Sequence, residues 1–136
     1  MRMILVWILA VLLLGMLAYI RLAPSDPAIW HVQPKGDADK TFRNGVLRRV
    51  SADKDGLQRM AAVIAAEPRT TLLKGSPELG MITYISRSRL VGFPDYTTIT
   101  MSGDDLLIYA RSRFGRKDLG VNGARVDRWI ATLAAN

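Results

Sequence analysis

Two arginine-rich segments carry the side chains in this sequence that are best suited to binding chemistry. Residues 87–89 and 111–113 both read Arg-Ser-Arg, and each segment is followed by a glycine and then by an aspartate, Asp95 or Asp118. Alternate residues of a strand share one face, so the two arginines of each segment would project together. Guanidinium groups bind phosphates and carboxylates through paired hydrogen bonds. The pattern therefore indicates a surface that could bind an anion.

Two interpretations of these arginines stay open. If the two segments lie on neighbouring strands, four guanidinium groups share one sheet face and form a pocket for a phosphate, a carboxylate or a lipid headgroup. Alternatively, the face is solvated and its arginines pair with carboxylates that fix the turns, for which the candidates are Asp95, Asp118 and Asp127. With the loop and helix start that follow the second segment, the candidate anion- or partner-binding residues are Arg87, Arg89, Arg111, Arg113, Arg116, Asn122 and Arg125.

Residues 114–122 lead into a predicted helix. A helix start can bind an anion through its free N–H groups. Asn122 also suits the N-cap of that helix, and the two glycines of the segment suit turns. No Gly-Lys-Ser/Thr follows these glycines, so the segment is not a phosphate-binding loop. We favour turn and cap roles for this segment.

Residues for catalysis are scarce. The sequence has no Gly-x-Ser-x-Gly, His-Glu-x-x-His or Ser-x-x-Lys arrangement with its partners. It has no cysteine, which excludes disulfides, thiolate metal sites and cysteine nucleophiles. Its single histidine, His31, has no cluster of carboxylates nearby that could complete a metal site. We therefore expect a non-catalytic protein that uses no cofactor or metal.

The charge balance is basic. The 136 residues include 19 lysines and arginines against 12 acids, a formal net charge of +7. Most of the cations are arginines, which favours fixed, bidentate contacts. Anionic lipid headgroups or an acidic protein partner suit this charge. The cations are spread along the chain without a long basic run, so we consider nucleic acid an unlikely partner.

The amino-terminal segment, residues 1–23, is predicted to be a transmembrane anchor. Residues 3–20 contain no charged side chain, and Arg2 and Arg21 flank them. As a helix this stretch would be roughly 27 Å long, enough to cross the hydrocarbon core. The residues before Leu22 form a poor cleavage site, which argues against a removable signal peptide. We expect a bacterial inner-membrane protein with a cytoplasmic amino terminus and a periplasmic domain.

The rest of the chain divides into a linker, residues 24–41, and a domain, residues 42–136. The linker is rich in proline and reads as an extended tether, with Trp30 at the membrane or on the domain and His31 in solvent. Apolar periodicity predicts helices around 57–64 and 126–133. Strands are predicted at 42–50, 69–74, 79–89, 95–101 and 106–113. These elements define an α+β class: a transmembrane helix, then a small, mostly antiparallel sheet with two helices.

Two runs of the sequence resemble a known family. They are IYARSRFGRKDLGVNGARVDRW at residues 108–129 and RSRLVGFPDY at residues 87–96. They resemble the carboxy-terminal signature of domain-of-unknown-function family 1499, small bacterial and plastid proteins that often begin with a hydrophobic segment. The resemblance covers residues 42–133, although a Pro-Asn-Cys-Val-like element of other members is missing. It implies a compact α/β domain and no established activity.

These observations lead to two functional hypotheses. The first is a membrane-anchored, non-catalytic accessory or interaction protein, a small subunit of a larger membrane complex with protein partners in the membrane. The alternative is a module that binds an anionic small molecule or lipid headgroup through the arginine-rich sheet face.

Overall fold

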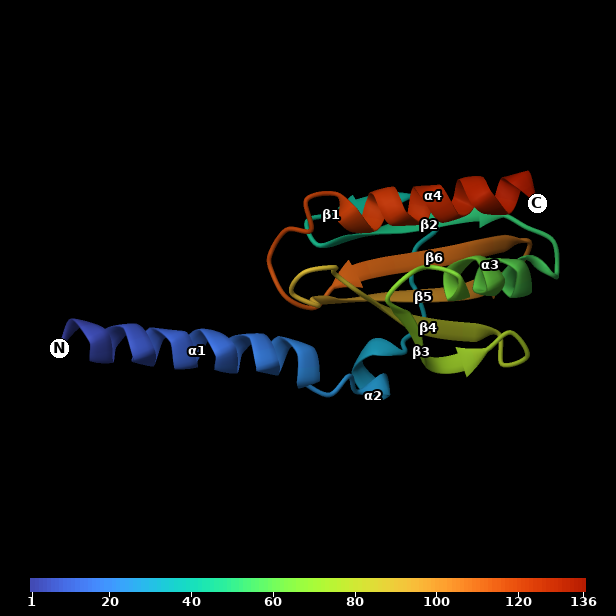
Figure 1. The fold of residues 1–136 in the computed structure, drawn as a ribbon. Coiled ribbons are helices and arrows are strands. Elements are labelled where there is room, and N and C mark those ends of the chain that lie inside the picture. Colours follow the sequence, from blue (N-terminus) through green and yellow to red (C-terminus); the bar gives the residue numbers. More distant parts are fainter.

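The amino-terminal helix stands apart from the rest of the protein. The structure is a computed structural model that describes residues 1–136. Helix α1 (Arg2–Leu22) projects away from a folded domain (Figure 1). Its most apolar window has a mean hydropathy of 2.8, and almost all of its side chains are exposed. By length and composition it is able to cross a membrane, as the sequence predicted.

The domain is built on one antiparallel sheet. Its six strands are arranged in the order β1-β2-β6-β5-β4-β3, and every neighbouring pair is antiparallel. The run of β-branched residues predicted to form a strand lies in β5, near the centre of the sheet. The predicted α+β class is thus confirmed. The strands are β1 (Lys40–Phe42), β2 (Gly45–Ser51), β3 (Thr70–Ser76), β4 (Met81–Arg87), β5 (Pro94–Ser102) and β6 (Asp105–Ser112).

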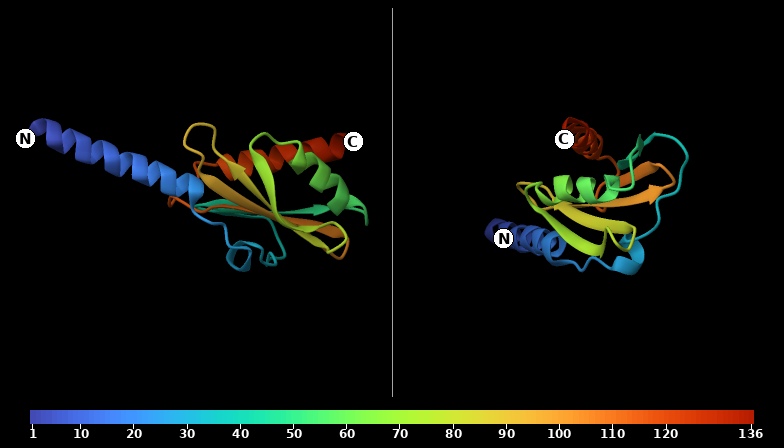
Figure 2. Two further views of the ribbon diagram at one scale, coloured as in Figure 1. Left: turned by 60° about the horizontal axis from the view of Figure 1, so that its bottom comes forward. Right: turned by 90° about the vertical axis from the view of Figure 1, so that its right-hand side faces the viewer.

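Two helices cover one face of the sheet. Helices α3 (Gly56–Ala65) and α4 (Val121–Ala135) lie side by side on this face (Figure 2). Both predicted apolar stripes point inward, and the largest buried side chain between helices and sheet is that of Trp129. The indole N–H of Trp129 donates to Glu67, so this ring is buried without an unpaired donor. Burial of these stripes forms the core.

The segment 42–50 contains the predicted strand as β2, but its first residues belong to a hairpin with β1. Strand β1 begins at Lys40, two residues before the expected domain boundary, and turns at Arg43 and Asn44 into β2. Gly45 begins β2 where it lies tightly against β6: a Cβ at this position would stand 2.1 Å from the carbonyl oxygen of Ala110. Only glycine fits such a close approach. Periodicity alone could not locate this turn, because both halves of the segment are extended.

The linker covers the second face of the sheet and is not a free tether. It contains a one-turn helix, α2 (Pro27–Trp30), and packs beneath the sheet opposite α3 and α4 (Figure 2). We call residues 24–39 the strap. The Trp30 ring stacks on Tyr96 with centroids 3.9 Å apart. The expectation that His31 lies in solvent was wrong, because its Nδ1 is 2.8 Å from the hydroxyl of Thr83, a buried residue.

We predict that replacing Trp30 with alanine loosens the strap. The change removes the stacked ring and costs about 2 kcal/mol of the free energy of unfolding, less than a fully buried tryptophan would. Trypsin should then cleave after Lys35 faster than in the wild type. Ile29→Ala is the matched control, because Ile29 is the exposed neighbour in α2. Equal cleavage of the two variants would show that the strap does not depend on this ring.

Candidate functional site

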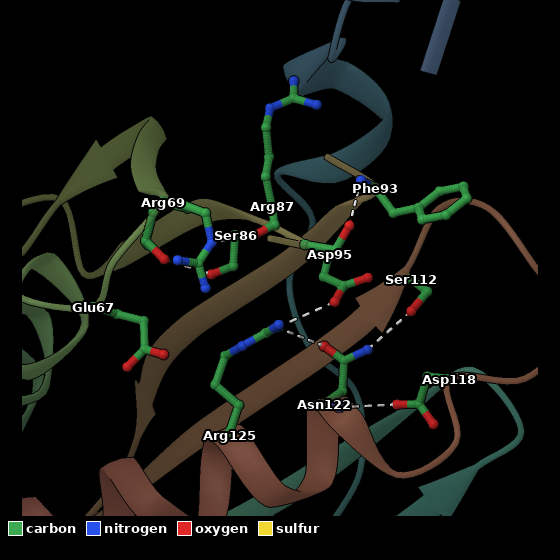
Figure 3. Close-up of polar contacts among 12 residues, drawn as sticks. Glu67, Arg69, Ser86, Arg87, Phe93, Asp95, Ser112, Asp118, Asn122 and Arg125 are labelled. Carbon is green, nitrogen blue, oxygen red and sulfur yellow. Dashed lines mark hydrogen bonds and ion pairs between the residues drawn. The ribbon is translucent and has the colours of Figure 1, made fainter. Parts of the chain in front are cut away.

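A buried polar cluster lies at the end of the sheet nearest α1. Asp95, at the start of β5, is the register partner of Ser112, at the end of β6. Arg125 reaches from α4 and places its Nη1 3.2 Å from Asp95 Oδ2 (Figure 3). Both side chains are only 11% exposed. The sheet end and the first turns of α4 therefore enclose one ion pair.

Asn122 connects this ion pair to the strand. Its Oδ1 accepts from Arg125 Nη1 at 3.3 Å, and its Nδ2 donates to Ser112 Oγ at 3.0 Å. The expectation that Asn122 is the N-cap was wrong, since Gly120 occupies that position with φ of 79°. The Asp118 carboxylate accepts from the backbone N–H groups of Gly120 and Asn122 instead. Asp118 thus does the capping, and the Asn122 side chain is free to point into the cluster.

The environment of Asp95 favours its neutral form. Burial raises the pKa of Asp95 above its ordinary value, while the Ser112 hydroxyl and the Arg125 guanidinium oppose that shift. Removal of Arg125 would leave a buried carboxylate without a counter-charge, the costly case for a buried ion pair.

A cavity of about 410 Å³ opens beside this cluster. Its polar lining includes Asp95, Ser112 and Lys117, and its apolar lining comes from the β4–β5 and β6–α4 loops and the start of α4. The remaining lining residues are Ser88, Phe93, Phe114, Gly115, Asp118, Leu119 and Val121.

The two Arg-Ser-Arg segments do not lie on neighbouring strands. β5 lies between β4 and β6, so the four arginines do not form one pocket. Arg87 donates to the carbonyl of Gly92 and closes its own loop. Arg89 follows the end of β4 and is exposed. On the strap face, Arg113 donates to the carbonyl of Pro24 at 2.8 Å.

Arg111 is buried on the strap face without a carboxylate partner. It donates to the Trp30 carbonyl, to Thr98 Oγ1 at 2.9 Å and to the Tyr109 carbonyl at 3.1 Å. Its guanidinium carbon is 4.6 Å from the centre of the Tyr109 ring. Burial lowers the pKa of Arg111 to about 10, so the group stays charged at neutral pH. Carbonyl oxygens and aromatic faces thus replace a counter-ion.

The aspartates predicted as partners do bind cations or helix amides. None of them pairs with an arginine of the Arg-Ser-Arg segments. Asp127 pairs with Arg48 of β2 at 3.0 Å. Asp95 pairs with Arg125, and Asp118 accepts from the α4 amides. Arg116 is exposed in the loop before α4. From the predicted residues, the structure gathers Asp95, Asp118, Asn122 and Arg125 into one cluster.

Sequence reasoning missed Ser112 and the apolar walls of the cavity. Ser112 stands inside the second Arg-Ser-Arg segment, but its pairing with Asp95 follows from strand register, which the sequence does not state. The cluster contains no histidine, since His31 lies on the strap face. No group of three or more His, Cys, Asp or Glu side chains is arranged to hold a metal ion. The polar side chains of the cluster are paired with one another, and only the Asp95 carboxyl among them has a raised pKa.

Fold and site together define a small α+β sheet domain carried on an apolar helix, with a polar cluster at the helix-facing end of the sheet. The chain belongs to the family described as protein of unknown function (DUF1499), whose sequence model matches residues 21–133. The match includes the strap as well as the sheet. Comparison with curated proteins gave no match. The packing of the strap on the sheet explains why both belong to one unit.

We predict that the Asp95 carboxyl makes the protein's stability depend on pH. Because its pKa is raised above 3.8, the native state binds this proton more tightly than the unfolded chain does. The stabilisation from this proton is complete below the pKa of Asp95 in the unfolded chain. It is lost as the pH rises through the pKa of Asp95 in the folded protein. The Tm of the wild type relative to Asp95→Asn should therefore fall as the pH rises above about 4, the ordinary aspartate pKa.

The exposed Asp104, in the β5–β6 turn, provides the control for this measurement. The variant Asp104→Asn should not reproduce the trend seen with Asp95→Asn. A difference in Tm between the wild type and Asp95→Asn that is constant with pH would contradict a raised pKa at Asp95.

Proposed function

We propose that the protein is a membrane-anchored, non-catalytic accessory subunit that holds a small domain in one orientation at the membrane surface for a protein partner. The observation that carries this proposal is the packed strap. The strap is joined to the sheet by the stacking of Trp30 and by hydrogen bonds from Arg111 and Arg113 to carbonyls of the strap. A binding module on a flexible tether would have no use for these contacts.

The state of the polar side chains supports a role without catalysis. Ser112, Asn122 and Arg125 bond to one another or to Asp95, and each is committed to a structural contact. A serine nucleophile needs an adjacent base, and the only histidine lies on the other face of the sheet. Arg111 and Arg113 bond to the strap, so we place no anion site on the arginine-bearing sheet face.

The proposed location is the bacterial inner membrane, with the domain in the periplasm. Long domains cross a membrane largely regardless of their charge, so the basic domain that follows α1 can be exported. This orientation places the strap and the sheet just outside the membrane.

We expect a cysteine at position 54 to be accessible from the periplasm. The wild type contains no cysteine, so the variant Lys54→Cys has one thiol, on an exposed turn far from α1. A membrane-impermeant maleimide should label it in intact cells as fully as after lysis. The unsubstituted protein is the unlabelled control. Labelling only after lysis would reverse the proposed orientation.

We also expect the protein to leave native membranes as part of a complex. Extraction in mild detergent, followed by sizing, should recover a companion in constant ratio to the full chain. Trp30→Ala should lower that ratio, because the domain loses its fixed orientation, whereas Ile29→Ala should not. A lone, monodisperse wild-type particle would contradict the accessory role.

A further inference from the structure

We call the end of the domain nearest α1 the proximal end. It includes the loops at residues 88–93 and 113–120 with the first residue of α4. Both loops lie beside the carboxyl end of α1 (Figure 1). The Tyr19 ring meets Phe114 edge-on with centroids 6.0 Å apart, and Phe114 in turn lies 6.4 Å from Phe93. Because Tyr19 is in the last turns of the apolar helix, the rings in contact with it lie at the level where that helix ends.

The proximal end exposes apolar side chains that the fold does not use. Leu119 and Leu90 are 90% and 88% exposed, the highest values among the large apolar residues that follow α1. Phe93 and Val121 are also exposed beside them. Leucine side chains at the tips of adjacent loops are exposed to water. Their transfer into an apolar phase would be favourable in free energy.

Charge is distributed unequally between the two ends of the sheet. The connections at the proximal end, residues 43–44, 66–69, 88–93 and 113–120, contain six basic residues and two acidic ones. The connections at the opposite end, residues 52–55, 77–80 and 103–104, contain one basic residue and four acidic ones. One of the two proximal acids, Asp118, uses both carboxylate oxygens at the start of α4. The cationic end is therefore the end that faces α1.

We propose that the proximal end is a lipid-contact surface that rests on an anionic bilayer. Leu90 and Leu119 enter the interface, while Arg89, Arg116 and Lys117 contact headgroup phosphates; this rests on α1 being the anchor of the proposed function. Basic residues next to a membrane span are attracted to anionic lipids, by about fivefold in binding for each cation. Arg89, Arg116 and Lys117 are all exposed to solvent, so their charged ends can reach headgroup phosphates.

The first experiment measures the depth of both loop tips in a bilayer. Full-length Leu90→Cys and Leu119→Cys carry an environment-sensitive fluorophore and are reconstituted in vesicles of equal parts phosphatidylglycerol and phosphatidylcholine. Lipids with a nitroxide near the headgroup should quench both labels strongly. Leu79→Cys is the matched control, because Leu79 is 78% exposed at the opposite end and should stay unquenched. Quenching at 90 and 119 no stronger than at 79 overturns the proposal.

A label within α1, at Leu12→Cys, measured with lipids that carry the nitroxide deep in the acyl chain, separates this proposal from the anchoring on which it rests. Deep quenching at 12 with none at 90 or 119 leaves the anchor and removes the lipid contact. No quenching at 12 removes the anchor itself.

The second experiment tests the cations. The Tm of the full chain should rise by several degrees when phosphatidylglycerol replaces phosphatidylcholine, because anionic lipid binds the native state. The triple variant Arg89→Gln, Arg116→Gln, Lys117→Gln should lose that rise, and Lys54→Gln should keep it. All three substituted side chains are exposed, so the fold does not depend on them. A rise that survives in the triple variant overturns the role of these cations.

Discussion

The contact between Arg111 and the strap is the interaction on which the arrangement of this protein depends. The helices cover one face of the sheet, and an antiparallel sheet can leave its other face to water. The second face carries a buried cation that can be desolvated only if oxygens and aromatic faces surround it. The Trp30 carbonyl and the Tyr109 ring supply part of that surrounding. Strap and sheet therefore require each other: without the strap the guanidinium would return to water, and without Arg111 the strap would lose its central partner.

The two ends of the domain differ from its two faces in how their polar and apolar side chains are covered. The faces are closed by helices and strap, and among their buried side-chain nitrogen and oxygen atoms only Thr97 Oγ1 has no hydrogen-bond partner. The ends are where unpaired charge and exposed leucines remain. At the proximal end the polar cluster of Asp95, Arg125 and Asn122 keeps the loops and the start of α4 together, so the exposed tips project from a fixed base. An accessory role at the membrane and a lipid-contact surface are thus compatible uses of one architecture.

Local patterns in the sequence were enough to predict the apolar helix, both amphipathic helices and most strands, because each depends on neighbours within a few residues. Leu57, Met60 and Ile64 recur at helical spacing and are buried as expected. Strand order is not a local property, so the separation of the two Arg-Ser-Arg segments by β5 could not be read from them. The strap was missed for a related reason. Its contacts with Tyr96 and Arg111 join residues distant in the chain, and its proline-rich composition is that of a free linker.

The strap also limits how far the domain can reach. A fully extended chain of the strap's length would span roughly 50 Å. Folded against the sheet, the same residues add almost no distance between α1 and the domain. With α1 as the proposed anchor, the domain would not extend outward to meet a partner in the surrounding fluid. A partner of the proposed accessory subunit would then have to reach it within a layer about one domain thick above the bilayer, a condition that a partner confined to the membrane meets at all times.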